Sequence, residues 1–410
     1  MTIRSDAKKI VKSALFAAMP DTAVKEALTH LKTKGGKLVL VAAGKAAWQM
    51  AKAASDVLGD KITEGLVITK YDHVKGDIPG IKCFEAGHPV PDDNSFNATA
   101  AAIEAVTGLS AKDTVLFLVS GGGSALFEKP LVSGAVLQDI TKQLLACGAD
   151  ITEINTIRKR LSAVKGGKFA QICAPAHVFS IILSDIIGDP LDMIASGPAY
   201  PDSTTQADAE GIIEKYKLQV SSEIKALLKI ETPKKLKNVE THVTGSVKQL
   251  CKAAIASCKE LGYEPHFLTA SLNCEARDAG SFLAAIARDN QDVEHSVAHI
   301  CGGETVVHLT GKGKGGRNQE IALSAAAGIA GLKNTAVFSF GSDGTDGPTD
   351  AAGGYADGKT AAALAKEGVK IPKILVENDA YHALQKVDGL IMTGPTGTNV
   401  NDLTVVLIKR

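Results

Sequence analysis

A run of three glycines between two serines, Ser120-Gly121-Gly122-Gly123-Ser124, is a place where backbone chemistry could bind an anion. The run follows an apolar segment and precedes a helical pattern. Consecutive glycines reach positive φ angles and can turn several N–H groups toward one point at the start of a helix. A tight packing turn is the alternative, although one or two glycines would satisfy it. We predict that these five residues bind phosphate, although they match neither the P-loop nor the dinucleotide-binding pattern.

Two cations stand at predicted helix starts. Lys45 follows Gly44 at the end of an apolar run, and a cation there opposes the helix dipole at a cost of up to ~1 kcal/mol. Either an anion offsets that cost or the lysine is solvated. Arg317 follows the glycine-rich stretch 311–316, and its guanidinium can donate two hydrogen bonds to one carboxylate or phosphate. We expect the two lysines within that stretch to be solvated on a flexible loop.

Three carboxylates follow another apolar run, at Asp185, Asp189 and Asp192. Grouped oxygen ligands suit Mg²⁺, which prefers one or two carboxylates together with substrate phosphate oxygens and water. The alternative is that Asp189 shapes a turn before Pro190 and that one of the other two caps a helix.

A second polar loop, residues 341–350, interleaves glycines and hydroxyl groups with Asp343 and Asp346. It is either a metal or substrate loop or a turn that caps itself, and it lacks the glutamate that would complete an EF-hand. Residues 393–402 form a comparable polar loop before the last predicted strand.

The elements that must position these side chains follow a βαβ pattern, because short β-branched runs alternate with alanine-rich amphipathic stretches. In open parallel sheets, ligands bind outside the carboxyl ends of the strands, and the polar loops fall at such ends. We therefore predict an α/β fold. The predicted strands are 38–43, 65–69, 113–119, 177–183, 241–244, 266–269, 296–301, 335–340 and 403–408.

A charged segment with little to bury, 231–238, contains Pro233 and is typical of a linker. The α/β alternation restarts after it. We predict two α/β domains, residues 1–235 and 236–410.

The overall composition excludes several classes of protein. The 410 residues contain 45 Lys and Arg against 45 Asp and Glu, so there is no excess positive charge for nucleic acid or an anionic membrane surface. No apolar run approaches the ~18 residues of a membrane span. The seven cysteines are scattered without a C-x-x-C pair, which indicates reduced thiols and a cytoplasmic location. We expect small-molecule partners, and a homodimer is compatible with the sequence.

Backbone anion sites, isolated cations and grouped carboxylates together suit phosphoryl transfer, in which positioning and charge neutralisation do most of the catalytic work. The chain has no G-x-S-x-G elbow and no H-E-x-x-H motif. The residues alone therefore indicate a small-molecule kinase or phosphotransferase.

Over nearly its whole length the sequence also resembles the glycerate 2-kinases that carry a C-terminal MOFRL domain. The resemblance lies in a series of motifs in order: 41–46, 87–92, 120–126, 158–167, 184–198, 302–305, 316–320 and 343–347. Where the family pattern has a histidine in the fourth of these motifs, this chain has Arg160, so a role for that histidine does not carry over.

The resemblance implies transfer of the γ-phosphoryl group of ATP to the 2-hydroxyl of D-glycerate, with Mg²⁺. It also implies a Rossmann-like N-terminal domain, a parallel sheet between two helical layers, followed by an α/β domain whose MOFRL region covers about 295–405. From the residues and the resemblance together, we expect Lys45, Arg317 and Asp185 to be catalytic. We also expect Gly44 and the glycine run to bind ATP. Asp185 or Asp189 would bind Mg²⁺ or accept the hydroxyl proton. The remaining predicted substrate ligands are Arg158, Lys165, Ser196, Gly197 and Asp343, and the predicted metal ligands are Asp189, Asp192 and Asp346.

Two other functions stay open. An NAD(P)H-dependent hydroxypyruvate reductase is one, because relatives of the family have carried that label. A G-x-G-x-x-G motif followed by an acidic residue ~20 positions on is missing, which counts against it. The other is a sugar-phosphate or nucleotide-binding protein without catalysis.

Overall fold

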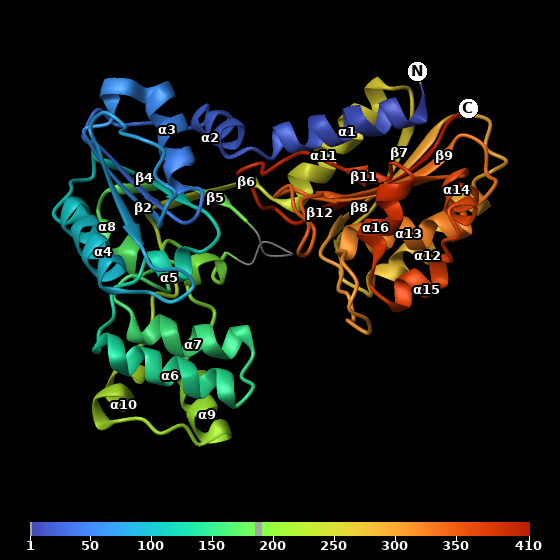
Figure 1. Cartoon of the computed structure of the whole chain (residues 1–410). Coiled ribbons are helices and arrows are strands. Elements are labelled where there is room, and N and C mark those ends of the chain that lie inside the picture. The colour runs from blue at the N-terminus through green and yellow to red at the C-terminus, as the bar shows by residue number, and fades with distance from the viewer. Residues whose placement is uncertain (1, 185–190) are drawn as a thin grey trace. The chain divides into compact units, whose positions relative to one another are not determined.

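The computed structural model describes residues 2–184 and 191–410, which fold into two units. The N-terminal unit comprises residues 20–184 and 191–244, and the C-terminal unit comprises residues 2–19 and 245–410 (Figure 1). Predicted Asp185 and Asp189 lie outside the described residues. No helix within the described ranges is both long and apolar enough to cross a membrane.

The N-terminal unit is built on a six-stranded sheet of order β3-β2-β1-β4-β5-β6. β1 pairs in parallel with β2 and β4, β2 with β3, and β4 with β5. This is the strand order of the doubly wound fold that binds nucleotides, which confirms the predicted Rossmann-like class. The strands are β1 (Leu38–Ala43), β2 (Glu64–Lys70), β3 (Ile81–Ala86), β4 (Thr114–Val119), β5 (His177–Leu183) and β6 (Val239–Gly245).

Helices cover both faces of this sheet, which is why β1 and β4 are continuous apolar runs rather than alternating ones. α2 (Pro20–Leu28) and α3 (Ala47–Leu58) share one apolar core with the sheet. α4 (Asp93–Val106) and α8 (Lys168–Cys173) contact one another below the sheet in the view of Figure 1. Short helical turns lie at α5 (Gly123–Leu126), η1 (Gly59–Lys61) and η2 (Ile194–Ser196).

A separate helical cluster extends from the same unit, and the strand-based reading of the sequence did not predict it. Its helices are α6 (Gly134–Ala146), α7 (Ile151–Leu161), α9 (Gln206–Tyr216) and α10 (Ser222–Leu228). Two of them begin with a capping box: Asp150 with Glu153, and Thr205 with Asp208. These caps satisfy the first N–H groups of α7 and α9.

The C-terminal unit contains a second six-stranded sheet, of order β11-β10-β9-β12-β8-β7. β12 runs antiparallel to both β8 and β9, whereas β7 and β8 are parallel. The second domain is therefore α/β as predicted, but its sheet is mixed. The strands are β7 (Glu264–Leu272), β8 (Val297–Gly303), β9 (Thr335–Gly341), β10 (Gly353–Asp357), β11 (Leu390–Ile391) and β12 (Asp402–Ile408).

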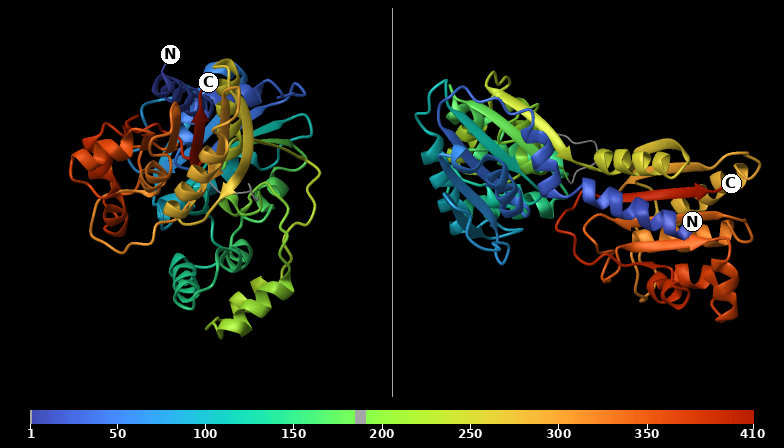
Figure 2. Two further views of the ribbon diagram at one scale, coloured as in Figure 1. Left: turned by 90° about the vertical axis from the view of Figure 1, so that its right-hand side faces the viewer. Right: turned by 90° about the horizontal axis from the view of Figure 1, so that it is seen from above.

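Both faces of the second sheet are also covered. α1 (Ile3–Ala17) and α11 (Val247–Glu260) pack side by side on one face (Figure 2). α12 (Ala276–Asp289) and α13 (Arg317–Gly328) cover the other. The remaining helices extend that second layer; they are α14 (Thr360–Lys366), α15 (Ile371–Val376) and α16 (Ala380–Lys386).

The boundary between the two units differs from the one predicted after residue 235. β6 completes the first sheet beside β5, so the strand predicted at 241–244 belongs to the N-terminal unit. The predicted linker 231–238 is attached there as well, because Thr232 is buried and its hydroxyl donates to Asp202 (2.7 Å). At the other end, α1 joins the C-terminal unit through buried Asp6, which accepts hydrogen bonds from Tyr263 and Lys409. Local composition did not predict these long-range interactions.

Candidate functional site

The glycine run lies where two loops meet at the carboxyl ends of neighbouring strands. β1 and β4 pair in register up to Ala43 opposite Val119, so the chain leaves both strands at the same height. The N–H of Lys45 donates to the carbonyl of Gly121 (2.8 Å), and the N–H of Ala46 donates to Ser120 Oγ (3.0 Å). The predicted cation and the predicted anion site are therefore parts of one structure.

Gly44 makes this approach sterically feasible. Its φ is +128°, and a Cβ built at this position would lie 2.2 Å from Ser120 Oγ. No other residue could bring the two loops so close without displacing one of them. The sequence signal was the single glycine before Lys45.

Lys45, Gly122 and His88 converge at the mouth of the glycine run. Gly122 has φ +84°, and a Cβ there would lie 3.0 Å from His88 Nε2 and 3.1 Å from Lys45 Cγ. Burial lowers the pKa of His88, and the charge of Lys45 lowers it further, so the imidazole is neutral at pH 7. Sequence reasoning did not place His88 in the site, although it lies in one of the family motifs.

The far side of the run contacts the predicted residue Ser196, whereas Gly197 packs against Asp192. Ser124 Oγ lies 3.2 Å from Ser196 Oγ, which donates to Asn155 Oδ1 (2.9 Å). A Cβ on Gly123 would lie 2.7 Å from the Cβ of Ala195. Tertiary structure thus brings Ala195 and Ser196 against the glycine run from more than 70 positions away in the sequence.

Two predicted substrate ligands, Arg158 and Lys165, point at the backbone behind the run. The Arg158 guanidinium and the Lys165 ammonium each donate to the carbonyl of Ser124 (2.9 Å), and Lys165 also donates to Phe127 (3.1 Å). Both cations face the buried carboxylate of Glu128, at 3.7 and 3.4 Å. Burial lowers the pKa of Lys165 to about 8, opposed by Glu128. This geometry holds the loop in place, and direct contact of either cation with substrate stays a prediction.

Asp192, a predicted metal ligand, is engaged by protein donors. Its carboxylate accepts from Lys159 Nζ (3.3 Å) and from the hydroxyl of Ser203 (2.7 Å). Lys159 is buried and also donates to Asp202 (2.9 Å). The contacts are those of a buried ion-pair network, so they give no support to metal binding by Asp192.

In the C-terminal unit, Arg317 begins α13 and is held by two carboxylates. Its Nε and Nη2 donate to the two oxygens of Asp402 (2.5 and 3.0 Å), and Nη1 donates to Glu304 (2.9 Å). Burial alone would lower the pKa of Arg317, but the hydrogen bonds and charge of Asp402 outweigh it and raise the pKa. The arginine is permanently charged, and its guanidinium is fixed in one plane.

Arg317 lines a polar cavity of about 330 Å³. The cavity lies where β8 and β9 end and β12 begins, because β12 runs antiparallel to both. Its walls are almost entirely polar: Glu304, Arg317, Ser342, Asp343, Asn399, Asn401 and Asp402. Asp343 from the predicted loop 341–350 lines this cavity, and its contact with substrate stays a prediction. Asp402 was noted in the polar loop 393–402 but was not assigned to a site.

Asp346, another predicted metal ligand, instead supports the start of α13. Its buried carboxylate accepts from the N–H groups of Asn318 (3.1 Å) and Gln319 (2.9 Å). Burial raises the pKa of Asp346 to about 7, against the effect of these hydrogen bonds. The arrangement is that of a helix cap contributed by a distant loop, and both carboxylate oxygens are engaged by protein donors.

The glycine-rich stretch 311–316 is attached along its length, contrary to the expected flexible loop. Gly313 donates to the carbonyl of Glu377 (2.8 Å), and the N–H of Lys314 donates to Asp379 (2.9 Å). The ammonium of Lys314 lies 4.4 Å from the ring centre of Tyr381. Lys314 is therefore only partly exposed, whereas Lys312 is exposed as expected.

The donors of the polar cavity fit Mg²⁺ better than Asp192 and Asp346 do, because both of those carboxylates accept from protein donors. Within residues 2–184 and 191–410, no three His, Cys, Asp or Glu side chains are grouped as a metal cage. Mg²⁺ does not need one, because it binds proteins through one or two carboxylates and takes its other ligands from water and phosphate. Glu304 and Asp343, with the amide oxygens of Asn399 and Asn401, form a donor set of that kind.

Comparisons with known proteins agree with this architecture. Residues 6–229 match the family described as "Domain of unknown function (DUF4147)", and residues 297–402 match the MOFRL family. The chain is 51% identical to a D-glycerate 2-kinase of Thermotoga maritima over 99% of both chains. It is 39% identical to a putative hydroxypyruvate reductase of Agrobacterium vitis, over 91% of this chain and all of that protein. A crystal structure of glycerate kinase from Thermotoga maritima superposes with a TM-score of 0.94 at 51% identity, over 98% of this chain and 99% of that one. The chain therefore belongs to the glycerate 2-kinase family that its motifs had indicated.

Proposed function

We propose that this protein is a glycerate 2-kinase, which transfers the γ-phosphoryl group of ATP to the 2-hydroxyl of D-glycerate. The observation that carries the proposal is the packing of Lys45 against the glycine run 120–124, where backbone N–H groups and an ammonium can meet one anion. The substrate class comes from the likeness to glycerate 2-kinases over the full length of the chain.

In this proposal the glycine run holds phosphate oxygens through its backbone. Lys45 neutralises charge that develops on the transferred phosphoryl group, because positioned cations contribute most where charge appears in the transition state. The neutral imidazole of His88 lies at the same place without adding a second positive charge beside Lys45. Arg158 and Lys165 act from behind by fixing the Ser124 carbonyl.

The polar cavity around Arg317 suits a small polyhydroxy acid. Glycerate has no apolar body, and the cavity offers almost no apolar wall. Asp402 holds Arg317 on one side, and among the described residues the exposed Glu304 is the hydrogen-bond partner of Nη1 on the other. A substrate carboxylate that displaced Glu304 would gain an oriented, charged hydrogen bond without moving the guanidinium.

Mg²⁺ is the expected companion of ATP, and Glu304 and Asp343 would hold it in this chain. When bound, it would neutralise charge on the phosphate oxygens and orient them. The acceptor of the hydroxyl proton stays a prediction, because Asp185 lies outside the described residues.

One observation in the sequence bears on the reductase alternative. Gly311, Gly313 and Gly316 do have the spacing G-x-G-x-x-G, which the sequence analysis did not identify. β8 ends at Gly303, however, and no strand leads directly into these glycines. A Cβ on Gly311 would strike the backbone of Glu377, and one on Gly316 would strike Asp346, so the glycines permit packing within the protein. The motif lacks its strand–turn–helix context.

A coupled assay tests the proposal. The purified protein is incubated with ATP, Mg²⁺ and D-glycerate, and enolase reports whether the product is the 2-phosphate. We expect enolase to consume the product directly. A product that needs phosphoglycerate mutase first would be the 3-phosphate and would contradict the proposal. Rapid oxidation of NADH by hydroxypyruvate would favour the reductase, and binding of ATP without turnover would favour a non-catalytic protein.

A further inference from the structure

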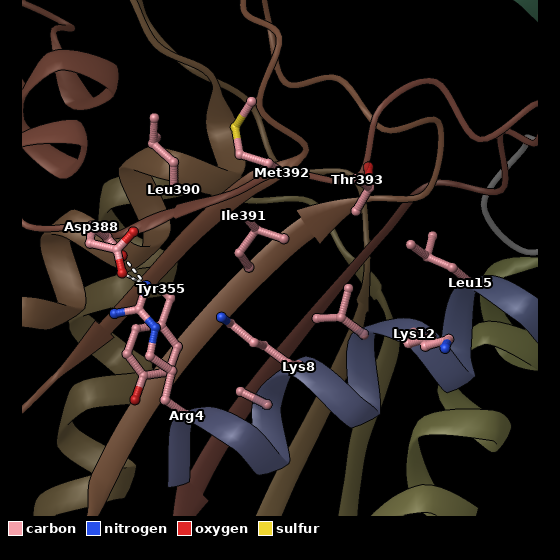
Figure 3. Close-up of a pocket in the computed structure, with 12 residues that line it drawn as sticks. Arg4, Lys8, Lys12, Leu15, Tyr355, Asp388, Leu390, Ile391, Met392 and Thr393 are labelled. Atoms are coloured by element: carbon pink, nitrogen blue, oxygen red, sulfur yellow. Dashed lines mark hydrogen bonds and ion pairs between the residues drawn. The ribbon is translucent and has the colours of Figure 1, made fainter. Parts of the chain in front are cut away.

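A second cavity in the C-terminal unit shares no lining residue with the polar cavity and has a different chemistry. It measures about 580 Å³ and opens between α1 and the β10–β11 edge of the sheet (Figure 3). One wall is the α1 face with Arg4, Lys8 and Lys12, and the other runs from Tyr355 to Thr393. Its size is that of a ligand pocket rather than a packing defect.

The body of this cavity is apolar. Ala7, Val11 and Leu15 form its helix side, and Leu390, Ile391 and Met392 form its sheet side. Met392 is 55% exposed at the rim of this concave surface. Covering such an apolar side chain removes its surface from water, which favours binding of an apolar group there. Glycerate is fully polar, so it is a poor match for this lining.

The charges of the cavity are unbalanced. Arg4, Lys8 and Lys12 follow one another at intervals of four residues, so three cations stand in a row along one stripe of α1. Arg4 is neutralised by Asp388 (3.0 Å) and lies 4.8 Å from the ring centre of Tyr355. Among the described residues that line the cavity, Asp388 is the one carboxylate. Lys8 and Lys12 are exposed, and in the described part of the chain no ion pair joins either ammonium.

The walls are held in place without a ligand. Buried Asp6, on the opposite face of α1, accepts from Tyr263 (2.8 Å) and Lys409 (2.6 Å). After the helix, the carbonyl of Ala18 accepts from the Thr398 hydroxyl (2.8 Å). Figure 3 shows Lys8 extending from α1 toward the end of the cavity that holds Arg4 and Tyr355, and Arg4 turned toward Asp388. The cavity is therefore preformed, and no binding free energy would be used to assemble it.

We propose that this cavity is a second ligand site, which binds a small amphipathic anion: a carboxylate, sulfonate or phosphate group on an apolar body. The apolar body packs against Leu390, Ile391 and Met392, and the anionic group meets Lys8 and Lys12. This binding does not depend on the proposed kinase activity, and neither ammonium belongs to the residues assigned to phosphoryl transfer.

A matched pair of fluorescent probes tests the site on the intact protein. The anionic probe is 8-anilinonaphthalene-1-sulfonate, and the neutral one is N-phenyl-1-naphthylamine, which has nearly the same apolar body. We expect saturable binding of the anionic probe with an affinity roughly 5-fold or more above that of the neutral probe, and a loss of this difference at high salt. Equal affinities for the two probes would overturn the proposal.

Variants locate the probe. The double variant Lys8→Gln/Lys12→Gln should weaken binding of the anionic probe roughly 5-fold or more, because two unpaired cations are removed. The matched control Lys252→Gln/Lys259→Gln removes two exposed lysines from α11 on the same face of the unit and should leave binding unchanged. Met392→Glu, which adds a like charge to the apolar wall, should weaken binding at least as strongly. Equal effects of the lysine pair and its control would contradict the site.

Two competition experiments cover the other occupants. If ATP displaces the anionic probe at the concentrations that support turnover, the cavity belongs to the reaction and the proposal of a separate site fails. If sedimentation shows a dimer that the probe dissociates, the cavity is an interface between two copies, which also overturns the proposal. Retained probe binding by a monomer saturated with ATP supports it.

Discussion

The glycine run of the N-terminal unit and the polar cavity of the C-terminal unit position their hydrogen-bonding and charged groups in two different ways. In the first, the proposed anion site is made of backbone groups from contiguous residues, and Lys45 packs beside it. In the second, Arg317 is clamped by side chains, and its main partner Asp402 lies 85 residues away. The geometry of the glycine run depends on close steric packing around its glycines. The geometry of the polar cavity depends on the ion pair between Arg317 and Asp402. Loss of charge should therefore have different consequences for stability in the two units.

The largest expected effect separates the two cations. Lys45→Ala and Arg317→Ala should each lower kcat by ~100-fold or more, the scale of losing one transition-state charge partner. Only Arg317→Ala should also destabilise the fold, by about 1–3 kcal/mol, because it leaves the carboxylate of Asp402 buried without its counter-ion. Steady-state kinetics and urea unfolding measure both quantities.

Exposed lysines provide the controls for that pair. Lys61→Ala in the N-terminal unit and Lys333→Ala in the C-terminal unit remove a charge far from either site and should change neither kcat nor stability. Near-normal turnover of Lys45→Ala or Arg317→Ala would remove that residue from the mechanism. Equal destabilisation by the two variants would remove the contrast between the sites.

A smaller change tests the clamp itself. Asp402→Asn keeps the side-chain shape but removes the carboxylate whose two oxygens accept hydrogen bonds from Nε and Nη2 of Arg317. We therefore expect kcat to fall about 10-fold. Glu304→Gln is the matched comparison on the same guanidinium. Because Glu304 is 46% exposed, its loss should cost less stability than that of Asp402. As a proposed Mg²⁺ ligand, Glu304 should act mainly on the Mg²⁺ concentration that turnover requires. A kcat for Asp402→Asn equal to that of the unmodified protein would show that the clamp does not orient Arg317.

The cap of α13 predicts a dependence of stability on pH. The folded pKa of Asp346, about 7, lies above the ordinary value because of burial, so the folded state binds the proton more tightly than the unfolded state. The contribution of Asp346 is fully present below pH ~4 and is lost as pH rises to ~7, on the order of 1–3 kcal/mol. Unfolding of the unmodified protein and Asp346→Asn between pH 4.5 and 8 measures it. The variant should lack this decline, and parallel profiles would contradict the assignment.

The smallest expected effect lies in the glycine run. Ser120→Ala removes the acceptor for the Ala46 N–H and should cost about 1 kcal/mol of stability, with a rise in KM for ATP and little change in kcat. Ser203→Ala, which removes a hydroxyl donor to Asp192, is a matched control in the same unit. A fall in kcat of Ser120→Ala comparable to that of Lys45→Ala would mean that the hydroxyl itself takes part in the reaction.

Several features of the fold could be predicted because they depend on neighbouring residues. The continuous apolar run at 38–43 required a strand covered on both faces, and Gly44 with Lys45 marked the turn at its end. The helical cluster around α7 could not be predicted in this way, because its apolar surface is completed by α9 and α10 from a later part of the chain. The same holds for β6, whose place beside β5 depends on pairing rather than on composition.

Contiguous residues encode the glycine run, its proximity to a strand end and the family to which the chain belongs, so these features could be recognised before folding is considered. The direction of β12 could not, and its antiparallel pairing with β8 and β9 places Asp402 opposite Gly303 and Gly341 and against Arg317. Strand direction depends on how the whole sheet buries its two faces, and no local pattern reports it. For that reason the position of the glycine run at a strand end could be predicted from the sequence, whereas the contacts of Arg317 with Asp402 and Glu304 had to be observed.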